Sequence, residues 1–92
     1  MKVAGQIREY LRQLHPEQRG MIKTSLRNLA DGKGGDVLAL TDELEGFYRL
    51  RAGRFRIIFR YLPDGEISCE YLNTRDTVYE RFATLREIIE RR

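Results

Sequence analysis

Apolar residues recur at helical spacing in two consecutive stretches of residues 1–30. The first stripe consists of Val3, Ile7, Tyr10, Leu11 and Leu14. The second stripe consists of Met21, Ile22, Leu26 and Leu29. Between them, Pro16 ends the first helix at His15 and suits the first turn of the second, because proline lacks a backbone donor. The glycine-rich residues 31–35 end the second helix, so the pattern predicts an α-hairpin.

From residue 36 onward the apolar spacing changes from helical to alternating. Residues 37–40 are a short apolar run, and strands are expected over residues 47–51, 54–61 and 66–73. A turn is expected at residues 63–65, where proline, aspartate and glycine follow one another. A C-terminal helix is expected from about Asp76 to Arg91, on a stripe made of Val78, Phe82, Leu85 and Ile89. The order predicts an α+β fold: an N-terminal α-hairpin packed on one face of a small antiparallel β-meander, followed by a C-terminal helix.

The two turns of the meander predict the same division of its side chains between two faces. A two-residue loop at Ala52 and Gly53 places Arg49 opposite Arg56. A three-residue loop at residues 63–65 pairs Phe59 with Cys69 and Ile57 with Tyr71. The predicted core face holds Tyr48, Leu50, Phe55, Ile57, Phe59, Tyr61, Ile67, Cys69 and Tyr71. The other face collects Phe47, Arg49, Arg51, Arg54, Arg56, Ile58, Arg60, Glu70 and Leu72, with Glu70 as its one expected acid.

Length and composition favour one globular domain spanning residues 1–92. The 92 residues are 41% hydrophobic and 34% charged, which is typical of a folded chain with a modest core. No apolar run is long enough to span a bilayer, and the N-terminus lacks a secretory signal, so we expect a cytoplasmic protein. Cys69 has no second cysteine to pair with and is expected to be a buried, small apolar side chain.

Positive charge is concentrated in residues 47–61. This segment carries five arginines and no acid, whereas residues 1–46 carry seven basic and seven acidic side chains, and residues 62–92 five and seven. Guanidinium groups bind phosphate through paired hydrogen bonds, so the arginine-rich face predicts an anionic partner. Two other interpretations stay open: a solvated sheet face without a ligand, and a surface that docks another protein.

Outside the arginine-rich face, few groups suggest chemistry. Tyr79, four residues after Arg75, is expected at the border of core and solvent, where packing is favoured over a chemical role. His15 immediately precedes Pro16, so a capping role is favoured over catalysis. The sequence shows no metal-ligand spacing, glycine-rich phosphate loop or Ser/His/Asp set, and we expect neither a cofactor nor a metal.

The order of these motifs resembles the RelE/ParE toxin superfamily of bacterial type II toxin–antitoxin systems. The resemblance covers residues 6–82 and is carried by YRLRAGRFRIIFRY at residues 48–61, the PDG turn, and EYLNTRDTVY at residues 70–79. It implies an antiparallel sheet of three to five strands with two helices on one side. Residues 1–3 leave room for only a short first strand, and its absence would expose a sheet edge to another chain.

The resemblance to RelE-type members implies a ribosome-dependent mRNA endonuclease that works without a metal. It implies catalytic roles for Arg56, Arg75 and Tyr79. It implies RNA binding by Arg49, Arg51, Arg54 and Arg60. Arginine stands where the best-known members have lysine, and a guanidinium cannot act as a general base. Catalysis would therefore depend on charge stabilisation, positioning and groups of the ribosome.

The resemblance also implies partners. These are a cognate antitoxin, in a heterotetramer or larger complex, together with the ribosome and its mRNA, and no membrane. Two alternatives stay open: a ParE-like toxin that poisons DNA gyrase without nuclease activity, and a catalytically silent antitoxin-binding module. The gyrase poison would stall DNA replication, whereas the endonuclease would stall translation.

Overall fold

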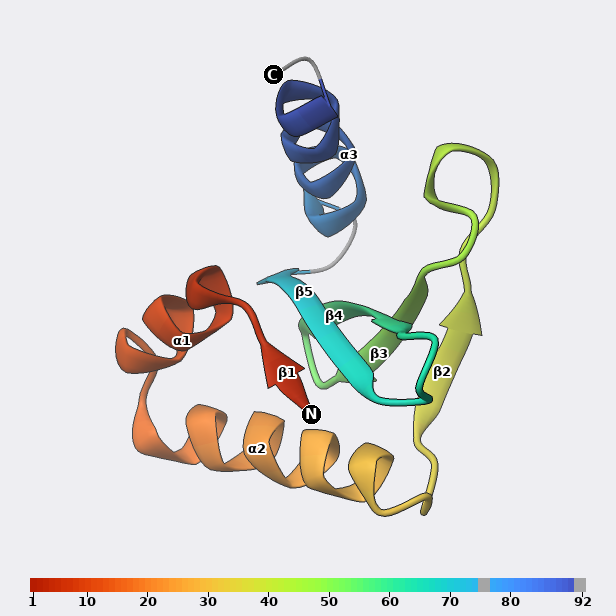
Figure 1. Ribbon diagram of the computed structural model, residues 1–92. Helices are drawn as coiled ribbons and strands as arrows, with labels where there is room; N and C mark the ends of the chain where they lie inside the picture. Colours follow the sequence, from red (N-terminus) through yellow and green to blue (C-terminus); the bar gives the residue numbers. More distant parts are fainter. Residues whose placement is uncertain (75–76, 91–92) are drawn as a thin grey trace.

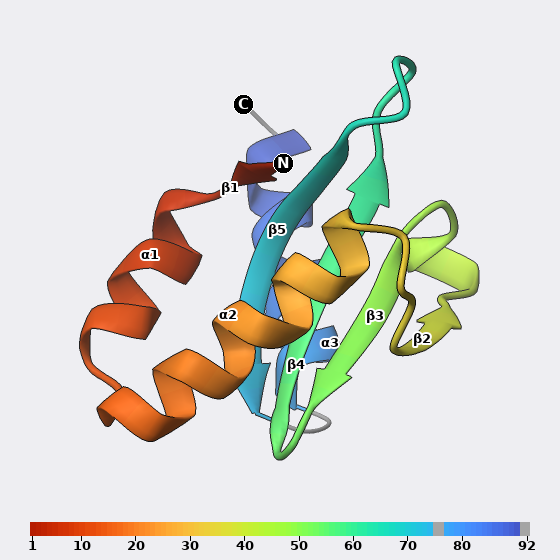
Figure 2. The same ribbon diagram turned by 90° about the horizontal axis from the view of Figure 1, so that it is seen from below.

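A computed structural model describes residues 1–74 and 77–90, which form an α+β fold around a five-stranded mixed sheet. The elements in chain order are β1 (Lys2–Val3), α1 (Gly5–Arg12), α2 (Pro16–Ala30), β2 (Asp36–Ala39), the 3-10 turn η1 (Asp42–Leu44), β3 (Tyr48–Ala52), β4 (Phe55–Tyr61), β5 (Ile67–Thr74) and α3 (Thr77–Glu90). The helices α1 and α2 lie on one face of the sheet and α3 lies on the other (Figure 1; Figure 2). The predicted fold class is confirmed.

The sheet has one strand more on each side than the predicted meander. Its order is β1-β5-β4-β3-β2. On one edge, β2 contains most of the apolar run at residues 37–40 and pairs antiparallel with β3. On the other edge, Lys2 and Val3 pair in parallel with Ser68 and Cys69 of β5. Val3 therefore belongs to a strand, and the first helix begins only at Gly5.

The side chain of Gln6 continues the edge pairing where β1 ends. Its Nε2 donates to the carbonyl oxygen of Leu72 at 2.7 Å, and the Leu72 amide donates to Gln6 Oε1 at 2.9 Å. The side-chain amide thus occupies the place of a neighbouring strand and satisfies both backbone groups of Leu72.

Both faces of the sheet are buried, each against its own helices. The cluster beneath α1 and α2 consists of Ile7, Leu11, Ile22, Leu26, Leu29, Leu50, Ala52, Phe55, Ile57, Phe59, Cys69 and Leu72. The cluster beneath α3 consists of Leu44, Phe47, Ile58, Val78 and Phe82. Because β4 is covered on both sides, it reads as a nearly continuous apolar run, with Arg56 and Arg60 as its basic residues.

A β-bulge in β5 overturns part of the predicted face assignment. The pairs on either side of the bulge are Phe59–Cys69, as predicted, and Ile58–Tyr71. Glu70 is therefore an extra residue in β5, and the faces exchange beyond it. Tyr71 lies on the α3 side and Leu72 in the cluster beneath α1 and α2, the reverse of the prediction. Tyr61, also predicted in the core, is 50% exposed at the end of β4.

The β3–β4 hairpin keeps its predicted faces with a different turn. Gly53 and Arg54 form the turn, and Arg51 lies opposite Arg56, where the prediction placed Arg49. The pairing of β3 with β4 is shifted by two residues from the predicted one, and an even shift leaves the residues of these two strands on their predicted faces. Arg54, however, moves from the sheet face into the turn. The φ of Gly53 is 60°, which suits glycine at the first position of a tight hairpin turn.

The predicted C-terminal helix is present, but only its first half is buried. Val78 is fully buried, and the Phe82 ring meets the Phe47 ring edge-on at a centroid distance of 5.2 Å. The helix then rises away from the sheet, which leaves Leu85, Ile88 and Ile89 exposed (Figure 1). None of the helices within the described ranges is long and apolar enough to cross a membrane.

Candidate anion-binding site

The sheet aligns four polar residues in one row across β2, β3, β4 and β5. Asp36 pairs with Arg51, Arg51 pairs with Arg56, and Arg56 pairs with Asn73. Side chains of directly opposed residues lie on the same face of a sheet, here the face that carries α3. We call Asp36, Arg51, Arg56 and Asn73 the polar row.

Arg56 is half-buried and holds the hairpin turn. Its Nη1 donates to the carbonyl oxygen of Gly53 at 2.7 Å and to that of Phe55 at 3.0 Å. One nitrogen of the guanidinium is therefore occupied by the backbone. The other two, Nε and Nη2, have no hydrogen-bond partner within residues 1–74 and 77–90, and they remain available to a ligand.

Asp36 supplies the negative charge between two arginines. Its Oδ1 lies 2.8 Å from Nη2 of Arg49, and its Oδ2 lies 3.8 Å from Nη1 of Arg51. Glu70 was the one acid that the sequence predicted on this face. That expectation is wrong, because β2 joins the sheet beside β3 and places Asp36 opposite Arg51.

The two arginines that contact Asp36 differ in how far their side chains are exposed to solvent. The side chain of Arg49 is only 15% exposed, and its Nε is buried without a hydrogen-bond partner. The side chain of Arg51 is 55% exposed and has only the longer contact with Asp36. Of the two, Arg51 is therefore the more accessible to solvent, and Arg49 holds Asp36 in place.

The other predicted RNA-binding arginines lie apart from the polar row. Arg60 is opposite Ser68 at the far end of β4, and its Nε lies 3.9 Å from a carboxylate oxygen of Glu70. It borders a groove of about 430 Å³ beneath the exposed half of α3. Arg54, in the turn, places its guanidinium 5.1 Å from the ring centre of Phe55.

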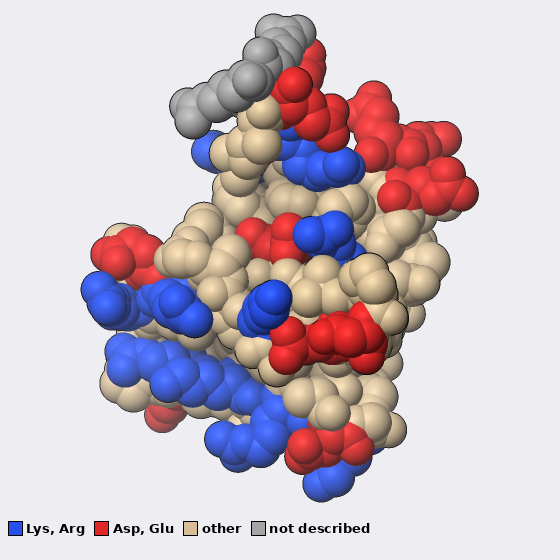
Figure 3. Space-filling view, in the orientation of Figure 1, with Lys and Arg blue, Asp and Glu red and all other residues tan. Residues whose placement is uncertain are grey.

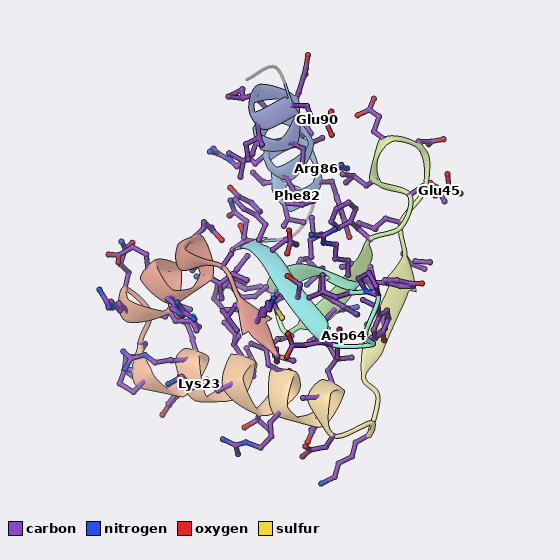
Figure 4. All side chains as sticks on the ribbon, in the orientation of Figure 1. Lys23, Glu45, Asp64, Phe82, Arg86 and Glu90 are labelled. Atoms are coloured by element: carbon purple, nitrogen blue, oxygen red, sulfur yellow. The ribbon has the colours of Figure 1, made fainter. Side chains whose placement is uncertain are left out.

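The α3 helix and the loop of residues 40–47 cover the sheet face next to the polar row. The Arg86 guanidinium lies 4.7 Å from the ring centre of Phe47, and its Nη1 donates to the Glu43 carbonyl oxygen at 3.5 Å. Figure 4 shows Arg86 and Phe82 on α3 facing the loop that carries Glu45. These contacts bury Ile58. The polar row lies beside this covered region, nearer to the β3–β4 turn.

Tyr79 is half-buried at the edge of the cluster beneath α3, as predicted for its packing. It borders a groove of about 300 Å³ whose lining includes Asp42, Glu43 and Glu80. The structure thus places Tyr79 among acidic side chains. Arg75, predicted to be catalytic, lies outside the described residues; it directly follows Thr74, which pairs with Phe55.

Two other predictions from the sequence are confirmed. The Glu17 amide donates to Nδ1 of His15 at 3.3 Å, so His15 caps α2. Cys69 is buried, and desolvation, with a smaller contribution from Glu70, raises the pKa of its thiol to about 11. A thiol in that state is a packing group rather than a nucleophile.

Asp36 and Asn73 are residues of the candidate site that were not predicted from the sequence. Asp36 precedes the apolar run at residues 37–40, and treating that run as a strand antiparallel to β3 would have placed it beside Arg51. Asn73 reaches the row because the bulge at Glu70 shifts the end of β5 by one residue. No periodicity in the chain marks that shift.

The polar row offers guanidinium donors of the kind that bind phosphate in proteins. Two like charges opposite each other destabilise a strand pair by about 0.2–1 kcal/mol, and a bound anion would relieve that repulsion. Arg51 and Arg56 are permanent donors and cannot accept a proton. Within the parts of the chain that the structure describes, no group of three His, Cys, Asp or Glu side chains could hold a metal ion.

The fold connects this chain with a known protein, whereas its sequence does not. A scan against protein-family models finds no match, and a search of curated protein sequences finds none. Among solved structures, a chain of the RelB-RelE antitoxin-toxin complex from Methanococcus jannaschii is similar, with a TM-score of 0.70 and 19% sequence identity. The similarity covers 89% of this chain and 99% of that chain. It shows a RelE-like fold, as the sequence predicts.

Proposed function

We propose that this chain is the toxin of a type II toxin–antitoxin system and that it cleaves mRNA in the ribosomal A site. The observation that carries the proposal is the polar row, in which Arg51 and Arg56 lie directly opposite each other on the sheet. The fold supports it, because the similar chain comes from an antitoxin-toxin complex. The remaining partners follow from this proposal: a cognate antitoxin, the ribosome and its message.

In the proposed reaction, the 2′-hydroxyl oxygen of a nucleotide attacks the adjacent phosphorus. A 2′,3′-cyclic phosphate forms, the bond from phosphorus to the 5′-oxygen of the next nucleotide breaks, and that oxygen receives the proton. Arg51, the exposed member of the row, binds the scissile phosphate. The free Nε and Nη2 of Arg56 stabilise the phosphorane as its charge develops. Arg75 is proposed as the third donor, toward the leaving oxygen.

The proton has to be moved by a group other than these arginines. Tyr79 and groups of the ribosome are the proposed carriers, and Tyr79 could equally stack on a base of the message. Arg49 positions Arg51 through their shared contact with Asp36. Arg54 and Arg60, on either side of the row, are proposed to bind flanking phosphates.

A second candidate function is a ParE-like gyrase poison. It is favoured by one observation: within residues 1–74 and 77–90, the acid beside the two opposed arginines is Asp36, and its carboxylate is engaged in ion pairs rather than free to accept a proton. A protein that acts by binding alone needs no such group. A silent antitoxin-binding module would use the same row to dock an acidic antitoxin segment.

Induction in bacteria, with separate pulse-labelling of protein and DNA synthesis, distinguishes these functions. We expect methionine incorporation to stop within minutes while thymidine incorporation continues. Arg51→Gln removes the cation that binds the scissile phosphate and should reduce cleavage by about 100-fold. Arg81→Gln, at an exposed position of α3, is the matched control and should stay toxic. Arrest of DNA synthesis with intact translation would instead establish the second candidate, and no arrest of either would leave the silent module.

A further inference from the structure

A second concentration of positive charge lies over α1 and α2, on the face opposite the polar row. Residues 1–30 carry six basic and two acidic side chains, whereas residues 31–46 carry one basic and five acidic. Figure 3 shows Lys and Arg in a band over α1 and α2, and Asp and Glu gathered over the loop that carries Glu45. The even charge balance of residues 1–46 therefore hides two regions of opposite sign.

Four of these basic residues line a groove between the two helices. Arg8 and Arg12 come from α1, Arg19 and Lys23 come from α2, and Leu11 completes the lining. The groove has a volume of about 320 Å³ and is open to solvent. We call it the helix groove; Lys23 lies midway along α2 (Figure 4).

Arg19 is a fixed part of the helix groove. Its Nε donates to the Leu11 carbonyl oxygen at 3.0 Å, and its Nη2 donates to the Leu14 carbonyl oxygen at 2.9 Å. The Leu11 carbonyl oxygen, in the last turn of α1, also accepts from the Leu14 amide at 3.2 Å, and the Leu14 carbonyl lies just beyond the end of the helix. Arg19 therefore joins the two helices and brings a constant positive charge to the groove.

The other three cations, Arg8, Arg12 and Lys23, are exposed to solvent. Within residues 1–74 and 77–90, Arg8 and Lys23 have no acidic side chain within ion-pair distance. Arg12 lies 3.3 Å from Glu9, but its side chain is 76% exposed, and such surface pairs contribute little to stability. Arg19, Lys23 and Arg27 recur every fourth residue, so the charge continues along α2 at steps of about 6 Å.

The chemistry of the helix groove fits a nucleic acid better than a protein segment. Protein interfaces centre on aromatic and apolar anchors, and this groove offers a single leucine among four cations. Interfaces with nucleic acids are more polar and much more positive. The lining also contains no aromatic side chain, whereas single strands are held largely by stacking on aromatic residues. A base-paired helix, which presents its phosphates outward, needs no such stacking.

We propose that the helix groove binds the phosphodiester backbone of double-helical RNA. The choice of RNA over DNA rests on the proposed function; the choice of a duplex backbone rests on the groove itself. The chain would then contact RNA on both sides, with a single-stranded message on the polar row and a structured RNA on α1 and α2. The duplex contact would orient the toxin before cleavage.

Fluorescence anisotropy with a labelled RNA duplex of about 16 base pairs tests the proposal without ribosomes. The variant is Arg8→Gln/Arg12→Gln/Lys23→Gln, which keeps Arg19 and hence the contact between α1 and α2. At about 100 mM salt we expect its affinity to fall by about tenfold or more, and its log–log salt slope to fall by about 2–3. Thermal unfolding followed by circular dichroism should match that of the wild type.

The matched control changes charge in the opposite direction on the same helices. Glu9→Gln/Glu17→Gln removes the two acids of α1 and α2 and should tighten duplex binding.

An unchanged salt slope in the triple variant would overturn the proposal. Tighter binding to a DNA duplex of the same sequence would overturn the choice of RNA, and loss of binding to a polyglutamate peptide alone would reassign the groove to an acidic protein. Duplex binding by a chain that does not arrest translation would refute only the proposed function.

Discussion

Arginine side chains in this protein take different roles according to where the backbone places them. Arg19 satisfies helix carbonyls, Arg86 covers the Phe47 ring, and Arg56 holds a turn. Arg51, by contrast, is exposed and keeps one long contact with Asp36. The residues look alike in the sequence, so tests of the site need to separate lost structure from lost chemistry.

Arg56→Ala and Arg51→Ala should differ in stability. The first change removes donors from the carbonyls of Gly53 and Phe55, and we expect the free energy of unfolding to fall by about 1–2 kcal/mol. The second removes an exposed surface pair and should change it by less than about 0.5 kcal/mol. Urea titrations of the two variants measure the difference. Equal losses of stability in the two variants would show that Arg56 does not support the turn. Because Arg51 has little structural role, Arg51→Gln is the better variant for measuring activity.

The buried thiol of Cys69 makes stability depend on pH in the alkaline range. Burial raises its pKa from 9.0 to about 11, so the folded chain holds the proton more tightly than the unfolded chain. The resulting contribution is fully present below pH 9 and is lost as the pH rises from about 9 to 11. Between pH 8 and pH 11, we expect the wild type to lose about 2 kcal/mol more than Cys69→Ala. Parallel pH profiles of unfolding for the two proteins would contradict this assignment.

Among the elements, α3 is attached to the sheet chiefly through Phe82, beside the buried Val78. Phe82 is 4% exposed and lies against Phe47 and Tyr71, at centroid distances of 5.2 and 5.9 Å. The exposed apolar residues further along the helix make no comparable contact. The attachment of α3 to the sheet therefore depends mainly on its first two turns.

Phe82→Ala should loosen α3. Truncation of a buried phenylalanine leaves a cavity, and we expect the free energy of unfolding to fall by about 3–5 kcal/mol. Ile88→Ala, on the exposed half of the same helix, should have almost no effect. If the alanine variant does not fold, Phe82→Leu is a smaller truncation that should give an intermediate loss of stability. Denaturation midpoints check the order, and similar midpoints for Phe82→Ala and Ile88→Ala would show that α3 is not anchored through Phe82.

Elements with strong local periodicity were predictable from the sequence, and elements that depend on distant pairing were not. The α-hairpin, β3 and β4 follow from apolar spacing. The turn between β3 and β4 differs from the predicted one, but the two strands keep their predicted faces because the register changes by an even number of residues. The bulge at Glu70 was not predictable, since the sequence alternates smoothly through it. The strands β1 and β2 depend on their neighbours in the sheet, and Asp36 entered the candidate site only through that pairing.

At the scale of the whole molecule, charge is divided between two faces and one end. The polar row lies on the α3 side of the sheet, the helix groove lies on the opposite side, and one group of acids, Asp42, Glu43 and Glu45, lies on the loop of residues 40–47 (Figure 3). Such a distribution orients a protein in the field of a nucleic acid, with its acidic end directed away. A single net charge of +3 conceals this arrangement.

Primer extension on a reporter mRNA in a reconstituted translation reaction tests whether this chain cleaves mRNA in the ribosomal A site. With the purified chain, we expect new 5′ ends within codons that occupy the A site, only when ribosomes are present, and at a rate reduced by about 100-fold in Arg51→Gln. Arg81→Gln should cleave like the wild type. Translation that proceeds to full-length product on an intact message would contradict the account.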